Sequence, residues 1–195
     1  VPTSRRTVHA SATPSWSWHT LSVRKPYRLD LTATVLRRSP TNRVDVLTPE
    51  GEYIRWFAGT THPEVVRVRQ TSSDALSVTM EAPPGEHRRL LELVTRSLGV
   101  DTDIETFRAQ AQRIPWLAPL VDRMQGVKPP RYASLWEACL NAVVFQQVSL
   151  AAASAIMGRL VRLGPSLTRD GITLNRPPDI GVFDGPQDVQ LPAAG

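Results

Sequence analysis

The residues with the clearest capacity for chemistry form a short polar elbow, Gln146-Gln147-Val148-Ser149, between two apolar helical patterns. Two side-chain amides and a hydroxyl so close together can donate and accept several hydrogen bonds. Because a helix on each side would hold the elbow on a rigid base, these side chains are well placed to meet a partner. The elbow therefore indicates a recognition element.

Other groups that carry chemistry are scattered along this sequence. The four histidines show no metal-ligand spacing and there is no cysteine cluster, so we expect no metal site and no cofactor. The glycines Gly51, Gly59 and Gly85 are isolated turn residues and not a phosphate-binding loop. No Ser-His-Asp set is assigned, because sequence order alone cannot place one. We therefore assign no catalytic residue.

The single cysteine, Cys139, excludes an internal disulfide. It lies inside an apolar helical pattern, which predicts a small core residue and not a nucleophile. No apolar run approaches the roughly 18 residues that a membrane helix needs. Arg5 and Arg6 are not followed by an apolar stretch, so no signal peptide is visible. These features predict a cytoplasmic protein without a membrane partner.

The charge is distributed unevenly along the chain. The 195 residues carry a net charge of +5, from 23 basic and 18 acidic residues. The segment from Ser166 onward carries −2, so residues 1–165 carry +7, nearly all of the basic residues being arginine. An arginine-rich body suits a polyanion such as nucleic acid. Arginine that only solvates the surface would give the same composition.

Ahead of the elbow, residues 25–82 have the pattern of β-structure. Apolar and polar residues alternate from Tyr27 to Val35, which predicts a first strand. The turn Pro49-Glu50-Gly51 joins two of the other strands. Those strands are expected over 43–48, 52–57, 64–70 and 75–80. Together they would form an antiparallel sheet that is polar on one face.

Three helices are expected to follow and to cover this sheet. The first carries Leu90, Leu91, Val94 and Leu98 and ends at Gly99. Asp103 caps the second, over 104–112. The third begins at Pro115 and ends at Gly126.

The helices on both sides of the elbow have their own signals. Ser134 and Glu137 form a Ser-x-x-Glu capping box before the first, and Ser149 can cap the second. The residues expected to face the core are Trp136, Leu140, Val143 and Val144 in the first helix and Leu150, Ile156, Leu160 and Leu163 in the second.

The connector Lys128-Pro129-Pro130-Arg131 marks the main domain boundary. The expected parts are an irregular arm over 1–24, an α+β N-terminal domain over 25–127, the start of a helical domain over 128–165 and an irregular tail over 166–195. In the arm, Trp16 and Trp18 alternate with Ser17, which fits either a short strand or a sticky tail. The tail is rich in proline and contains no helical window.

Several motifs occur here in a characteristic order: Pro26-Tyr27-x-Leu29, the strand-rich first third, Gly126-x-x-Pro129-Pro130, and Trp136-Glu137 leading to Phe145-Gln146-Gln147-Val148-Ser149 with its alanine-rich follower. In this order they resemble the DNA-3-methyladenine glycosylase II family of the helix-hairpin-helix DNA glycosylase superfamily. The resemblance runs from about residue 26 to residue 163, roughly 70% of the chain.

The resemblance implies an α+β fold, in which an antiparallel sheet with helices, similar to half of the TATA-binding protein, precedes an all-helical glycosylase domain. It implies a base-excision repair enzyme that flips an alkylated purine out of double-stranded DNA and hydrolyses its N-glycosidic bond. An elbow side chain fills the vacated space. A carboxylate stabilises the transition state, and aromatic side chains stack on the cationic base. A nucleoid-associated monomer is expected.

Three residues are implied to bind DNA. Gln146 falls on the family's elbow glutamine, and Ser149 closes the same motif. Gln147 falls at the wedge position, where the best-known member has leucine; a glutamine can still insert and hydrogen-bond the orphaned base. Val35 falls where that member has a pocket phenylalanine, so this chain departs from the family there.

Beyond Gly164 the departure is larger. The family continues with a hairpin of Leu-x-Gly-x-Gly-x-x-Thr-Ala type, which grips a phosphate through backbone N–H groups, and then with the catalytic aspartate. Neither is present, and the aspartates of the tail lie in another context. A truncation or frameshift near residue 170 is therefore expected, and it would leave the apolar faces of the helices around the elbow exposed.

Two other classes stay open. A non-catalytic DNA-binding module would use the basic sheet and the elbow without chemistry, and salt-sensitive duplex binding without base release would favour it. An interaction or purely structural domain would show no DNA binding at low salt.

Overall fold

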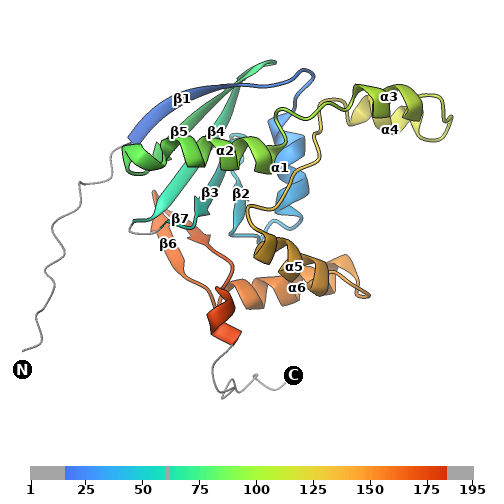
Figure 1. Cartoon of the computed structure of the whole chain (residues 1–195). Coiled ribbons are helices and arrows are strands. Elements are labelled where there is room, and N and C mark those ends of the chain that lie inside the picture. Colours follow the sequence, from blue (N-terminus) through green and yellow to red (C-terminus); the bar gives the residue numbers. More distant parts are fainter. Residues whose placement is uncertain (1–15, 60–61, 184–195) are drawn as a thin grey trace, which may run out of the picture.

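A five-stranded antiparallel sheet lies at the centre of the protein (Figure 1). Its strands are β1 (Trp16–Ser22), β2 (Asp45–Leu47), β3 (Tyr53–Phe57), β4 (Glu64–Ser72) and β5 (Ala75–Glu81). Their order is β1-β5-β4-β3-β2, and each is antiparallel to its neighbours. The computed structural model describes residues 16–59 and 62–183. It confirms the predicted α+β fold and the four strands predicted after residue 43.

The first predicted strand, from Tyr27 to Val35, is wrong because this segment forms the helix α1 (Leu29–Arg37). Leu29, Ala33 and Leu36 are buried at helical spacing, and their positions fit a helical period as well as part of the alternation. Asp30 in the first turn also favours a helix through the helix dipole.

The fifth strand comes from the predicted irregular arm. Residues 16–22 form β1, which pairs along its whole length with β5, so that part of the expectation is wrong. The alternation of Trp16 and Trp18 with Ser17 belongs to this edge strand. Residues 1–15, the first part of the predicted arm, lie outside the described residues.

The main hydrophobic core lies between one face of the sheet and the helices α1 and α2 (His87–Leu98). The sheet contributes the buried side chains of Tyr53, Phe57, Val66, Val68, Leu76, Val78 and Met80. Leu90, Val94 and Leu98 of α2 face them, as the helical spacing predicts. Gly99 ends α2 at φ 58°, the left-handed cap that the sequence predicts.

The helices α3 (Glu105–Ala111) and α4 (Ala118–Arg123) do not cover the sheet as expected. They project to one side of it (Figure 1) and contribute no side chain to the main core. Asp103 does satisfy the first turn of α3, since its carboxylate accepts a hydrogen bond from the Glu105 N–H at 2.9 Å. Phe107 of α3 and Trp116 of the turn between the two helices are exposed.

The opposite face of the sheet is covered by a hairpin that the sequence did not predict. The strands β6 (Ser166–Arg169) and β7 (Ile172–Asn175) pair within the predicted irregular tail, which is therefore wrong over this part. Leu174 is fully buried with Ile54 and Val65 of the sheet. This face is thus partly apolar. Beyond the hairpin, η2 (Ile180–Phe183) forms a short 3-10 turn.

The elbow joins the helices α5 (Leu135–Val144) and α6 (Leu150–Val161). The Ser134 hydroxyl accepts a hydrogen bond from the Glu137 N–H at 3.1 Å, and the Ser149 hydroxyl accepts one from the Ala152 N–H at 3.2 Å. Both predicted N-caps are therefore confirmed. None of the helices in the described part of the chain has the length and hydropathy of a membrane span.

The predicted inner faces of α5 and α6 are only partly buried. Leu140 lies in the interior, whereas Val143, Leu150, Ile156 and Leu163 are exposed. Cys139, predicted as a core residue, is exposed as well. The reason is that within residues 16–59 and 62–183 no further element packs over this side of the helix pair, as its exposure shows.

Candidate nucleic-acid interface

The elbow presents its polar residues on the surface, between the end of α5 and the start of α6. The side chains of Gln146, Gln147 and Val148 are exposed. Gln147 has φ 58°, in the left-handed region that costs a residue with a Cβ about 1–2 kcal/mol. Backbone strain of this kind persists where the surrounding structure imposes it, as the two helices do here.

The structure brings Gln146, Gln147 and Ser149 together within this one turn, as predicted. Ser149 also has a structural role, because its hydroxyl oxygen caps α6. Its O–H remains a donor that can face a ligand. Whether these three residues contact DNA stays a prediction.

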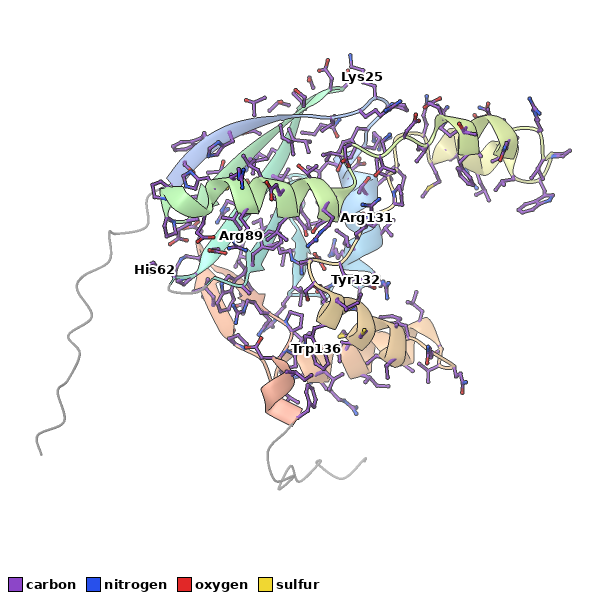
Figure 2. The ribbon with its side chains drawn as sticks, viewed as in Figure 1. Lys25, His62, Arg89, Arg131, Tyr132 and Trp136 are labelled. Carbon is purple, nitrogen blue, oxygen red and sulfur yellow. The ribbon has the colours of Figure 1, made fainter. Side chains whose placement is uncertain are left out.

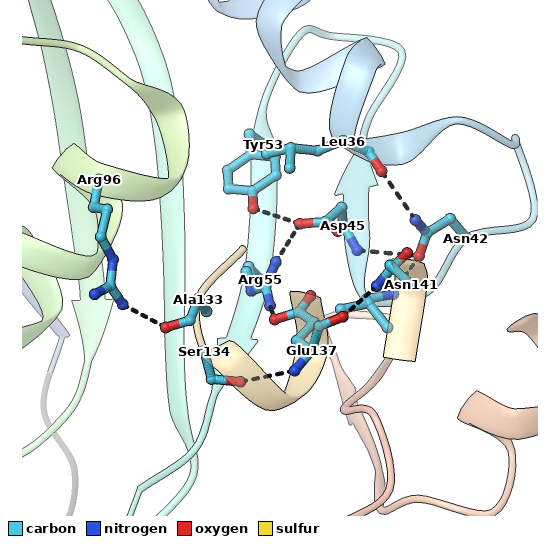
Figure 3. A network of polar contacts seen from close by, with 11 residues as sticks. Leu36, Asn42, Asp45, Tyr53, Arg55, Arg96, Ala133, Ser134, Glu137 and Asn141 are labelled. Atoms are coloured by element: carbon cyan, nitrogen blue, oxygen red, sulfur yellow. Dashed lines mark hydrogen bonds and ion pairs between the residues drawn. The ribbon is translucent and has the colours of Figure 1, made fainter. Parts of the chain in front are cut away.

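A buried ionic network attaches the base of α5 to the sheet (Figure 3). The Arg55 guanidinium donates to the Asp45 carboxylate and to the Glu137 carboxylate, both at 2.6 Å. The Tyr53 hydroxyl donates to Asp45 at 2.7 Å. The Glu137 carboxylate therefore does not bind the Ser134 N–H to close the capping box. It connects the first turn of α5 to Arg55 of strand β3.

The ionisation of this network follows from its burial. Burial, with the Asp45 charge beside it, raises the pKa of the Tyr53 hydroxyl well above its ordinary value. Burial opposes the charge of Arg55, but the carboxylates of Asp45 and Glu137 more than offset it and raise the Arg55 pKa. Tyr53 thus stays a neutral donor and Arg55 stays charged.

Asn42 shapes the loop between α1 and β2, next to this network (Figure 3). Its amide N–H donates to the Arg37 carbonyl at 3.0 Å, and its amide oxygen accepts from the Val44 and Asp45 N–H groups at 2.8 and 3.2 Å. These bonds fix the loop against the start of β2, and the loop forms one wall of a cavity.

Arg38 makes a second connection to the elbow. Its guanidinium lies 4.3 Å from the centroid of the Phe145 ring, the residue directly before Gln146, and donates to the Tyr132 hydroxyl. Tyr132 lies on the segment that leads into α5 (Figure 2). Burial raises the pKa of Tyr132 despite the opposing charge of Arg38. Tyr132 is therefore a neutral phenol, and the Arg38 charge is not neutralised by it.

A cavity of about 550 Å³ lies beside the elbow, between the α1–β2 loop, α5, α6 and β7. Its lining includes Arg37, Arg38, Arg43, Phe145 and Arg162. Sequence reasoning missed it, because its walls come from segments more than a hundred residues apart. The adjacent arginines at the end of α1 were the only local signal.

Two carboxylates line this cavity, and both are already bound. Asp45 and Glu137 are the buried partners of Arg55. Across residues 16–59 and 62–183 no three His, Cys, Asp or Glu side chains are grouped to hold a metal ion. Val35 lies on the exposed side of α1 and is not among the lining residues.

No protein-family model and no curated protein matches this chain in sequence. Solved structures match its fold, with TM-scores from 0.52 to 0.70. The 3-methyladenine DNA glycosylase from Archaeoglobus fulgidus is 19% identical, with a TM-score of 0.70 over 85% of this chain and 57% of that one. MBOgg1, in complex with a low-affinity DNA ligand, is 15% identical, with a TM-score of 0.59 over 87% of this chain and 56% of its own.

The 8-oxoguanine glycosylase/lyase of Clostridium acetobutylicum, in its apo-form, is 16% identical, with a TM-score of 0.57 over 84% of this chain and 54% of that one. The same enzyme also matches in complex with double-stranded DNA that contains cytosine opposite 8-oxoguanine, with a TM-score of 0.52. The chain thus spans about half the length of these glycosylases. The likeness confirms the predicted resemblance at the level of the fold.

Proposed function

We propose that this chain binds double-stranded DNA through the α5–α6 elbow and serves base-excision repair, as the part of a DNA N-glycosylase that probes the duplex. The observation that carries the proposal is the elbow itself. Gln146 and Gln147 are exposed at a strained turn. The Arg55 network holds the first turn of α5 on the sheet, and the Arg38–Phe145 contact holds the residue directly before the elbow.

The surroundings of the elbow support a polyanionic partner. The chain carries +5, and arginines at the end of α1 and in the α1–β2 loop line a cavity that reaches Phe145, the residue directly before the elbow. Lys and Arg contacts to phosphates supply much of the affinity of DNA-binding proteins. The lesion we propose is an alkylated purine of the 3-methyladenine type, and the protein would act as a nucleoid-associated monomer in the cytoplasm, without a cofactor.

Gln147 provides the direct test of DNA binding. Gln147→Gly removes the side chain and suits the left-handed backbone, so folding stability should change by no more than about 1 kcal/mol. Affinity for a duplex with one abasic site should fall about tenfold, which corresponds to roughly 1.4 kcal/mol of lost contact. Fluorescence anisotropy with a labelled duplex measures this change.

Gln147→Asn is the matched variant, because asparagine tolerates a positive φ and keeps a shorter amide. It should bind between the wild type and Gln147→Gly. Equal affinity of all three proteins would show that the elbow does not enter the duplex. Absence of duplex binding at low salt would instead favour a structural or interaction domain.

The 195-residue chain is expected to release no 3-methyladenine from alkylated duplex DNA. Cleavage of the glycosidic bond needs a carboxylate that stabilises positive charge on the sugar, and Asp45 and Glu137 are both engaged by Arg55. Chromatography of the released bases is the measurement. Release that disappears when Asp170 or Asp179 is changed to asparagine would contradict this expectation.

A second candidate function is a DNA-binding module without catalysis. The occupation of both cavity carboxylates by Arg55 favours it. Salt-dependent duplex binding together with no base release would be the expected pair of results.

A further inference from the structure

The cavity beside the elbow is strongly cationic. Four arginines line it: Arg37 and Arg38 at the end of α1, Arg43 in the following loop, and Arg162 at the end of α6. Three of these side chains, Arg38, Arg43 and Arg162, belong to exposed residues. The four arginines bring four positive charges to the lining of one cavity, and like charges gathered in this way favour the binding of an anion.

The described residues offer these arginines no acidic partner. Over 16–59 and 62–183, none of the four forms an ion pair with a carboxylate. Arg55 takes up the two acidic residues of the lining, Asp45 and Glu137. Arg38 contacts Tyr132 and Phe145, and Arg37 donates to the Pro40 carbonyl at 3.4 Å; all of these partners are uncharged. The positive charge of the cavity therefore remains available.

The helix dipole explains the positions of two of the four arginines. Arg37 and Arg162 lie at the C-terminal ends of α1 and α6, where cations favour the helix dipole. Arg43 lies in a loop and has no such role. Its side chain donates no hydrogen bond within the described segments, whereas the neighbouring Asn42 fixes the loop backbone. Substitution of Arg43 is therefore the most direct test of whether the cavity binds an anion.

We propose that this cavity binds a phosphate group carried by a nucleotide. Guanidinium groups are the preferred partners of phosphate oxygens because they donate two parallel hydrogen bonds. The volume of about 550 Å³ lies within the range of small-molecule sites, larger than a lone phosphate requires. Phe145 and Tyr132 add aromatic surface, and Ser39 and Thr41 add hydroxyl donors to the same lining.

The phosphate can come from two sources. One is a free nucleotide; the other is the backbone of a duplex held by the neighbouring elbow, a case that rests on the proposed function. Both sources use the same guanidinium–phosphate contacts. They differ in whether the cavity binds a ligand when no DNA is present.

The first arm of the test titrates the full chain with dAMP, with deoxyadenosine as the uncharged counterpart, by calorimetry at low salt. A site for free nucleotide binds dAMP and not deoxyadenosine. Arg43→Ala then weakens dAMP binding about tenfold, the loss expected for a charge-assisted hydrogen bond to phosphate. The second arm measures binding of a duplex oligonucleotide over a range of salt concentrations.

In the second arm, Arg43→Ala should reduce the slope of log affinity against log salt by about one if Arg43 contacts a backbone phosphate. Arg113→Ala is the matched control, because Arg113 is an exposed turn arginine of the projecting α3–α4 pair. It removes the same charge away from the cavity and should leave dAMP binding and the slope unchanged. Circular dichroism confirms that both variants are folded.

Either a loss of dAMP affinity or a reduced slope that is specific to Arg43→Ala supports the site and identifies its source. Equal effects of Arg43→Ala and Arg113→Ala in both arms would overturn it, as would deoxyadenosine binding as tightly as dAMP. A chain that binds dAMP through Arg43 while Gln147→Gly has no effect on duplex binding would refute the proposed function and keep the phosphate site.

Discussion

Replacing Glu137 by alanine is expected to lower the free energy of unfolding by about 3–5 kcal/mol, the usual cost of removing one partner from a buried ion pair. Glu137 and Arg55 have side chains that are only 6% and 3% exposed. The loss of one of its two carboxylates leaves the Arg55 guanidinium buried with part of its charge uncompensated. Urea denaturation followed by circular dichroism measures the change.

Two variants separate this effect from a general loss of charge. Glu137→Gln keeps the shape and one acceptor, so its stability should lie between those of the wild type and Glu137→Ala. Glu92→Ala removes the exposed partner of Arg88, whose nitrogen lies 3.7 Å from the carboxylate, and should cost less than about 0.5 kcal/mol. Similar unfolding of Glu137→Ala and Glu92→Ala would show that the network does not hold α5 to the sheet.

The network also matters for the elbow. Glu137 lies in the first turn of α5, whose last turn leads into Phe145 and Gln146. If α5 were held less firmly on the sheet, the elbow could occupy several positions. Pre-organisation of a binding element lowers the entropy lost on binding, so the network is part of the proposed recognition device as well as of the fold.

Leu174→Ala is expected to destabilise the protein by about 2–5 kcal/mol, the range for leucine truncation in a packed interior. Leu174 is fully buried against Ile54 and Val65, and it is the main apolar contact of the β6–β7 hairpin with the sheet. Polar contacts add to it, since Arg169 pairs with Glu81 at 2.9 Å. Thermal or urea unfolding of the variant gives the measurement.

Leu163→Ala is the control for this experiment, because Leu163 is half-exposed at the end of α6 and its truncation should cost less than about 1 kcal/mol. If the two variants were equally stable, the hairpin would not be packed on the sheet. Since Ile172 and Thr173 of β7 line the cavity, Leu174→Ala should also weaken the phosphate contact that the cavity makes, with dAMP or with the duplex backbone.

Elements whose signals are local could be predicted from the sequence. The turn Pro49-Glu50-Gly51, the left-handed cap at Gly99 and the N-caps Ser134 and Ser149 depend on residues within a few positions of one another. Such patterns bias the backbone before any tertiary contact forms. The polar elbow, and with it the resemblance to a glycosylase, was recognisable for the same reason.

Features in which distant segments meet depend on tertiary packing and could not be predicted from local patterns. The segment from Tyr27 to Val35 fits both the two-residue period of a strand and the spacing of a helix. Burial of Leu29, Ala33 and Leu36 under one face of the sheet selects the helix. The β6–β7 hairpin is short and proline-flanked, so its stability comes from packing against β3 and β4.

The same reason applies to the candidate sites. Arg55 and Glu137 are 82 residues apart in the sequence. The arginines of the cavity come from residues 37–43 and from Arg162. A local pattern cannot show that a strand arginine meets a helix glutamate, or that α1 and α6 enclose one space, because the spacing that encodes local structure says nothing about which elements pack together. The residues of the elbow are neighbours in the sequence, whereas the arginines of the adjacent cavity are brought together only by folding.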